Sequence, residues 1–223
     1  MGFVDWEAKR AWAAAEHETR SATPADGDER EDLRLAAVAG ASWAEGLAAL
    51  MTGDDAAEAL LQRAADEYRV SWEAAPPGSW GRPIAMLRCR LIAGDDAGAR
   101  DDAEAALAAG VLDAPGPIGG YCAALALLVL GRDAEGGRIA ERLEADGLRP
   151  ASVAHALAAL ARGTVEPYEH ARRDVLTSFE ERDAFLEDVA VADTVLVLDA
   201  LARGRGLAYE PLRSPLLPAS RDA

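Results

Sequence analysis

The sequence is poor in the residues that build disulfide frameworks, β-sheets and basic surfaces. Its 223 residues include two cysteines, one lysine (Lys9) and no asparagine, and 5% of them are aromatic. Cys89 and Cys122 lie far apart, without CxxC spacing or clustered histidines, so neither a zinc site nor a disulfide framework is expected. No stretch alternates apolar and polar residues for long enough to predict a half-buried strand.

A secretory leader and a membrane-spanning segment are not expected either. Residues 1–12 carry Asp5 and Glu7 and lack the apolar core of a signal peptide. The longest apolar run, 122–130, has about half the length of a membrane-spanning helix. We therefore expect a cytoplasmic protein, in which 122–130 forms a central, buried helix because it is apolar on all sides.

Acidic residues dominate the charge of the chain. There are 39 acidic and 23 basic residues, which gives a formal net charge of −16. A field of this sign repels phosphate backbones and anionic lipid head groups, so binding to nucleic acid or to a membrane surface is disfavoured. It is compatible with a basic protein partner, and equally with acidity that serves only solubility.

The residues that are abundant favour helices. Alanine is the commonest residue, and leucine, arginine and glutamate are also frequent. These are strong helix formers, and the apolar residues recur at helical spacing along most of the chain. The sequence therefore predicts an all-α fold of about ten helices, arranged as stacked antiparallel helix pairs.

A repeated turn supports the stacked pairs. Gly53, Gly94, Gly131 and Gly163 each follow an apolar helical stretch, and they are spaced by 41, 37 and 32 residues. Glycine can take the left-handed conformation that ends a helix. The Asp or Thr that follows within two residues is expected to cap the next helix. A period in this range is typical of stacked helix pairs.

The pattern divides the chain into four parts. Apolar periodicity predicts an N-terminal helix, and the Pro, Gly and acidic residues after it predict a loop. A helical-repeat domain follows, in which Leu33 and Leu186 are expected to face inward. The last part should be an extended apolar tail that packs back on the domain. The N-terminal helix, the loop, the helical-repeat domain and the tail are expected to span 1–20, 21–32, 33–206 and 207–223, in this order.

One segment resembles a known helical repeat. Residues 84–110, IAMLRCRLIAGDDAGARDDAEAALAAG, look like a tetratricopeptide-type helix pair, with an apolar first helix, Gly-Asp at the turn and small residues at helical spacing. The aromatic signature positions of that family are mostly missing and the period is irregular. The resemblance implies a TPR-like α-α superhelix, a scaffold that presents a concave groove to peptides or proteins.

A second resemblance covers residues 168–218, under a quarter of the chain. A long helix, an acidic corner at 185–188, an Ala/Leu-rich helix ending at 202–206 and the tail 214–218 are similar to the C-terminal part of a family of bacterial polymorphic-toxin immunity proteins. This resemblance implies a helical inhibitor that binds and blocks a cognate toxin.

Two acidic motifs suggest a different chemistry. Residues 54–58, Asp-Asp-Ala-Ala-Glu, resemble the aspartate-rich box with which prenyl-transferring helical enzymes hold magnesium and diphosphate, and 101–104 could supply a facing motif. The simpler interpretation is that Asp54 and Asp55 cap the helix after Gly53 and place acids in its first turn. We predict no metal, no cofactor and no catalytic residue.

Five residues are candidate contacts for a protein partner. Glu180, Glu181, Glu187 and Asp188 are expected on one long helix, where they form either a partner-binding acidic patch or a solvated face. Trp80 lies in a loop rich in Pro and Gly, where it could anchor a partner or fill the gap between two helix pairs.

These observations lead to one functional hypothesis and two alternatives. The chain is expected to be a non-catalytic helical-repeat protein that binds another protein or a peptide, and the charge allows this partner to be basic. The first alternative is an immunity protein that neutralises a bacterial toxin. The second is a helical enzyme with a metal held by carboxylates.

Overall fold

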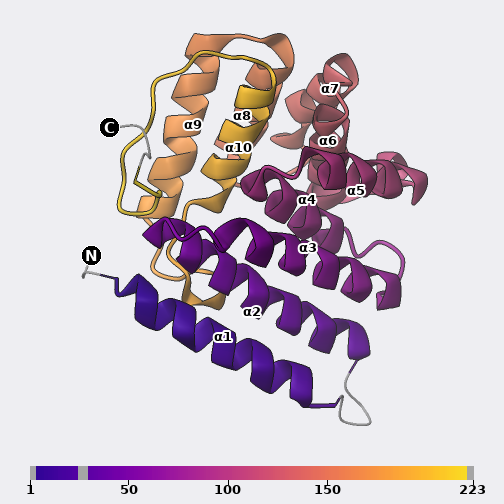
Figure 1. The fold of residues 1–223 in the computed structure, drawn as a ribbon. Helices are drawn as coiled ribbons and strands as arrows, with labels where there is room; N and C mark the ends of the chain where they lie inside the picture. The colour runs from indigo at the N-terminus through magenta and orange to yellow at the C-terminus, as the bar shows by residue number, and fades with distance from the viewer. Residues whose placement is uncertain (1–3, 25–29, 220–223) are drawn as a thin grey trace.

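The computed structural model describes residues 4–24 and 30–219, and in this part of the chain it contains ten α-helices and no strand (Figure 1). The predicted all-α fold is confirmed. The helices are α1 (Trp6–Ala22), α2 (Glu31–Thr52), α3 (Ala57–Ala74), α4 (Gly81–Ala93), α5 (Asp96–Ala108), α6 (Gly116–Val129), α7 (Asp133–Leu143), α8 (Ala151–Arg162), α9 (Val165–Glu180) and α10 (Asp193–Gly204), with short 3-10 segments η1 (Val111–Asp113) and η2 (Leu186–Asp188).

Each helix from α1 to α9 packs on the next one in the chain. The α6 helix is buried along Cys122–Leu128, as its uniform apolarity predicts. Among the described residues, α2 alone is long and apolar enough to cross a membrane by length and composition. However, 61% of its apolar window is buried inside the structure, and the core helix of a globular protein meets the same criterion.

The start of α2 differs from the prediction. The helix begins at Glu31 rather than at Leu33, and α1 extends to Ala22, so the predicted loop is shorter than 21–32; its residues 25–29 lie outside the described part. Asp32 is buried because Arg30 donates to its carboxylate over 2.7 Å and Ser71 donates to its carbonyl. With Asp32 facing inward, the expected inward residue Leu33 is instead 48% exposed.

The repeated turn has the predicted geometry. Gly53, Gly94, Gly131 and Gly163 have φ values of 71°, 74°, 72° and 65°, all in the left-handed region. In each turn the amide after the glycine donates to the carbonyl five residues earlier, over 2.9–3.1 Å, and the glycine amide donates three residues back. This pair of hydrogen bonds satisfies the last carbonyls of the helix and defines a Schellman motif.

The capping role of the residues after these glycines is only partly as predicted. Asp95 caps α5, since its Oδ1 accepts from the Gly98 amide over 2.9 Å. Asp54 accepts instead from Ala56, before α3 begins. The Thr164 hydroxyl turns back to the carbonyl of Ala159 and leaves the start of α9 without a side-chain cap. The shared feature of the repeats is therefore the glycine and not the cap.

The last helix does not extend the row of neighbours. Instead, α10 packs on α4 as well as on α8 and α9 (Figure 1). Arg88 of α4 donates to the carboxylate of Asp193, the first residue of α10, over 2.7 Å, and Asp193 is buried. At the other end, Arg205 donates to the carbonyl of Leu128 at the end of α6 over 2.6 Å. The chain thus returns its C-terminal helix onto its middle helices.

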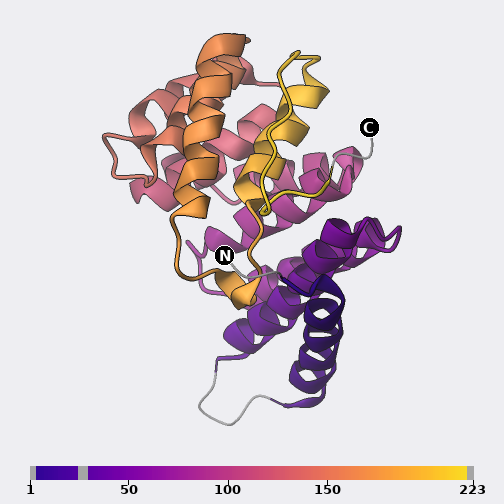
Figure 2. The ribbon, with the colours of Figure 1, turned by 90° about the vertical axis from the view of Figure 1, so that its left-hand side faces the viewer.

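Residues 207–219 form an extended tail along α9 and α10 (Figure 2). The Leu216 carbonyl accepts from the Ala192 amide over 2.9 Å, and the Ser214 hydroxyl donates to Glu180 over 2.7 Å. Leu216 and Leu217 are buried. The tail is therefore an integral part of the folded body.

The turn glycines generate a stability prediction. Nothing lies within 4 Å of a Cβ placed on Gly94, so a substitution there meets the backbone penalty of its positive φ and no steric clash. We expect Gly94→Val to lower the free energy of unfolding by about 1–2 kcal/mol or more, measured by urea denaturation. Gly81→Val is the matched control, since Gly81 also has open space and carries no positive φ. Equal effects of the two substitutions would contradict the left-handed turn.

Candidate functional site

The structure separates the four acidic residues that were expected on one helix. The α9 helix ends at Glu180, and Glu187 and Asp188 lie in η2 with φ values of 50° and 52°. The prediction of one long acidic helix is therefore wrong. The physical reason is that Val189 and Val191, which follow directly, are buried among the side chains of α1 to α4 and draw this linker away from the axis of α9. Leu186, predicted to face inward, is 57% exposed.

Glu187 has a structural partner within the chain. Its Oε1 accepts from Arg20 of α1 over 3.0 Å, and its side chain is 17% exposed. Arg20 also donates to the carbonyl of Ala37 in α2 over 2.9 Å. A Cβ on Gly40 would lie 2.9 Å from the same Glu187 oxygen, so the glycine makes room for this contact. Glu187 therefore fixes the α9–α10 linker onto α1 and α2.

The other sequence-predicted contacts lie in three separate places. Glu180 and Glu181 are exposed at the end of α9, where Glu180 accepts from the tail, whereas Asp188 is exposed in η2. Trp80 precedes α4 and is half-buried against a small cluster that includes Val111. Its position is that of a side chain filling the space between α4, η1 and α6.

In each of the two acidic motifs of the metal hypothesis, one aspartate forms ion pairs with arginines. Arg10 pairs with Asp54, and the Ala56 amide together with Arg10 lowers the pKa of Asp54. Asp102 is buried beneath Arg69 and Arg90, and this burial raises its pKa in spite of the two arginines. Within residues 4–24 and 30–219, no three His, Cys, Asp or Glu side chains are grouped so that they could hold a metal ion.

The two thiols are buried in helices. Burial raises the pKa of Cys89, and likewise the pKa of Cys122, to about 12. Burial also raises the pKa of Tyr121 to about 12. At neutral pH both thiols are therefore protonated and shielded from solvent, which is the behaviour of small apolar core residues.

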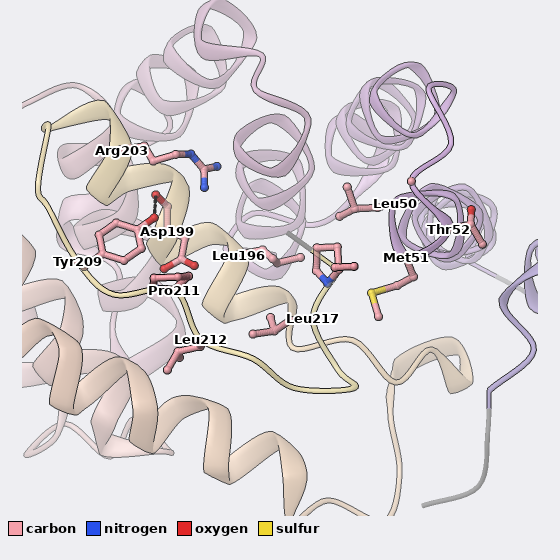
Figure 3. A pocket seen from close by; sticks show the side chains of 13 residues that line it. Leu50, Met51, Thr52, Leu196, Asp199, Arg203, Tyr209, Pro211, Leu212 and Leu217 are labelled. Atoms are coloured by element: carbon pink, nitrogen blue, oxygen red, sulfur yellow. Dashed lines mark hydrogen bonds between the residues drawn. The ribbon is translucent and has the colours of Figure 1, made fainter. Parts of the chain in front are cut away.

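A hollow of the surface lies where the end of α2, the α10 helix and the tail meet (Figure 3). It has a volume of about 590 Å³. Its lining is mainly apolar, with a few polar groups at its edges: Leu50, Met51, Thr52, Gly53, Leu196, Asp199, Arg203, Tyr209, Pro211, Leu212, Leu217, Pro218 and Ala219. We call this the apolar hollow.

A buried arginine holds one wall of the apolar hollow in place. Arg172 of α9 donates to Asp199 of α10 over 2.6 Å and also donates to the carbonyl of Glu210 in the tail. The Tyr209 ring lies 4.4 Å from the Arg172 guanidinium, and Tyr168 donates to Asp199 over 3.0 Å. Arg172 is 1% exposed, so these groups rather than solvent compensate its charge.

A second recess lies on the other side of the α2 terminus. It has a volume of about 490 Å³ and is lined by Glu7, Arg10, Ala11, Ala14, Glu45, Thr52 and Asp54. Thr52 lines both hollows. We call the second one the acidic recess, because three of its four charged residues are acids.

Sequence reasoning did not find either hollow. The apolar hollow joins α2 to α10 and the tail, which are far apart in the chain, and helical periodicity does not predict such contacts. The available signal was the apolar composition of 211–218 together with the prediction that the tail packs back. It did not indicate which helix the tail would approach.

The chain matches no protein-family model, and comparisons with curated proteins and with solved structures found no match.

The buried thiols generate a prediction for alkaline pH. Their pKa rises from the ordinary 9.0 to about 12 on folding, so the unfolded chain loses these protons first as the pH rises. The stabilising effect of the protonated thiols is complete below pH 9 and is lost between pH 9 and about 12. By pH 11, we expect the ionisation of each thiol in the unfolded chain to lower the free energy of unfolding by about 2.5–3 kcal/mol.

Urea denaturation from pH 8 to 11 measures this loss. A protein carrying both Cys89→Ala and Cys122→Ala is the control, and it should lose less stability with pH because the contribution of the two thiols is removed. The same slope in both proteins, or rapid reaction of a thiol-specific reagent with the native protein at pH 8, would contradict the burial of the thiols.

Proposed function

We propose that this chain is a non-catalytic helical protein that binds another protein or a peptide. The observation that carries the proposal is the apolar hollow. Its lining consists mainly of Leu, Met and Pro side chains, and it opens to solvent between three packed segments. Hollows of this kind accept apolar anchor side chains, which supply much of the energy in protein interfaces.

The repeated Schellman turns support the proposal in a general way. Helix pairs joined by short turns are the building units of binding scaffolds, and the pairs here share a buried core. The α10 helix packs across α4 and α8. It therefore covers a face that would be exposed to a partner in an open superhelix. The proposed contact surface is therefore the hollow at the α2 terminus and not a continuous concave groove.

Charge favours a basic partner. With a net charge of −16, the protein attracts cationic surfaces over several ångströms and so accelerates the encounter with them. The narrower form of the proposal is an immunity protein that captures a basic toxin. It is supported by the same charge and by the resemblance of residues 168–218, which include most of α9, all of α10 and most of the tail.

The metal-dependent enzyme is the less supported alternative. Asp54 and Asp102, one from each acidic motif, already form ion pairs with arginines. A magnesium ion would have to displace those arginines before it could bind the carboxylates.

The proposal predicts how binding depends on salt. A partner isolated by affinity capture from the native host should associate more slowly as salt rises, because the Debye length falls from about 30 Å at 0.01 M to about 8 Å at 0.15 M. Stopped-flow measurements should show an association rate that drops at least about tenfold over this range, with a smaller change in the dissociation rate. Sucrose at matched osmolarity is the control and should leave the rate unchanged. Failure of any protein to bind with defined stoichiometry would refute the proposed function, whereas a salt-independent rate would refute only the basic partner.

A further inference from the structure

We infer that the apolar hollow is a binding site for a free carboxylic acid with an apolar body, whose hydrocarbon part lies against the leucines of the hollow and whose carboxylate pairs with Arg203. The inference goes beyond the proposed function, because it concerns a small molecule and needs no protein partner. Its basis is the lining of the hollow, which combines apolar walls with one cation that has no ion pair in the described part of the chain.

The walls of the hollow suit a hydrocarbon chain. Leu50 and Met51 project into it from α2, and Leu196 and Leu217 face them from α10 and the tail (Figure 3). Its volume of about 590 Å³ lies within the range of about 300–1,000 Å³ that is usual for small-molecule sites. Mainly apolar walls with a few polar groups at one edge are also typical of such sites. The larger part of a matching ligand is therefore apolar.

The one acid of the lining is already neutralised. Asp199 accepts from Arg172 over 2.6 Å and from Tyr168 over 3.0 Å. Arg172 also donates to the carbonyl of Glu210 and is buried. Arg172 and Asp199 thus form a pair that adds no net charge to the hollow, and Asp199 offers no free carboxylate to a cation.

Arg203 is the charge that remains. It lines the hollow from the last turn of α10, and its side chain is exposed. No carboxylate among the residues that the structure describes forms an ion pair with it. Burial and Asp199 raise the pKa of Tyr209, and the positive charge of Arg203 opposes this rise. The guanidinium therefore lies close to Tyr209, another residue of the lining.

The helix ends reduce this positive charge without cancelling it. The end of α10 carries roughly half a negative elementary charge, which leaves part of the charge of Arg203 uncompensated. The α2 helix also ends at the hollow, but the carbonyls of Ala49 and Leu50 already accept from the amides of Asp54 and Gly53 over 3.0 and 3.1 Å. The hollow thus keeps an excess of positive charge at its α10 edge.

A single arginine without an ion pair favours a ligand with one negative charge. The planar guanidinium can donate two parallel hydrogen bonds to a carboxylate. A phosphate monoester brings nearly two negative charges and would meet only this one cation, in a protein whose net charge is −16. A cationic ligand would be repelled by Arg203. An apolar monocarboxylate therefore complements both the walls and the edge.

The lining also favours a free acid over the carboxylate at the end of a peptide. A peptide brings amides that need hydrogen-bond partners, and an amide buried without one is unfavourable. The walls consist mainly of side chains that cannot form such bonds, and Pro211 and Pro218 have no amide hydrogen to donate. A second copy of this chain would carry the same net charge of −16 and be repelled.

Isothermal titration calorimetry of the wild-type protein at neutral pH tests the site with three compounds. Octanoate is the probe, octanol has the same chain length without the charge, and acetate has the charge without the chain. We expect octanoate to bind with a Kd below about 1 mM. Octanol and acetate should each bind at least about fivefold more weakly, because each lacks one of the two groups that the hollow recognises.

Two variants then locate the binding. Arg203→Gln should raise the Kd of octanoate at least about fivefold and change that of octanol less than about twofold, whereas Met51→Ser should raise both at least about threefold. The matched controls are Arg173→Gln, an exposed arginine of α9, and Leu186→Ser, an exposed apolar residue of η2. Both lie outside the lining and should change either Kd less than about twofold. Circular dichroism checks that each variant is folded.

The inference is overturned if octanoate shows no saturable binding below about 1 mM, or if octanol binds as tightly as octanoate. It is also overturned if Arg203→Gln behaves like Arg173→Gln, since Arg203 would then only compensate the end of α10. Tighter binding of a peptide that ends in leucine with a free carboxylate would overturn it in favour of a protein terminus. Because the three compounds are compared on the wild-type protein, the result holds even if a variant fails to fold. No partner protein is present, so a negative result would leave the proposed protein binding unaffected.

Discussion

The arrangement of the whole chain depends on how the two acids of α10 are neutralised. Asp193 lies 2.7 Å from Arg88 of α4, and Asp199 lies 2.6 Å from Arg172 of α9. A buried charge without a partner is strongly unfavourable, so α10 can occupy its place only when both arginines meet their acids. These two pairs fix α10 in position and in rotation between helices that precede it by up to about a hundred residues.

The candidate site is a consequence of this return. Once α10 is seated, Arg172 can also bind the carbonyl of Glu210 and stack against Tyr209, which directs the tail across the surface. The linker before α10 is held in turn by Glu187 on Arg20 and by the burial of Val189. The apolar hollow exists because the tail and α10 approach the end of α2 without filling the space beside Leu50 and Met51. Its polar edge is therefore preorganised by groups that hold the fold together.

Local features of the sequence predicted the local features of the fold. The all-α class, the buried α6 and the left-handed glycines follow from composition, periodicity and turn chemistry, all of which act over a few residues. The sequence places the acidic stretch after Glu180 on a helix because glutamate is a good helix former and no Gly or Pro marks the end. Val189 and Val191 were the available sign of a buried linker, but their partners lie in distant helices. The pairing of Arg88 with Asp193 could not be predicted for the same reason. Periodicity identifies a residue that faces inward, but it does not identify the residue that it contacts. The hollow could not be predicted because it depends on these distant contacts.

The most direct test of this account is a double-mutant cycle on Arg88 and Asp193. Arg88→Met and Asp193→Leu should each lower the free energy of unfolding by about 2–4 kcal/mol, since each leaves one charge buried without its partner. The double variant should be more stable than the sum of the single effects predicts, with a coupling of at least about 1 kcal/mol measured by urea denaturation. Effects that simply add would contradict the claim that this ion pair holds α10 on α4.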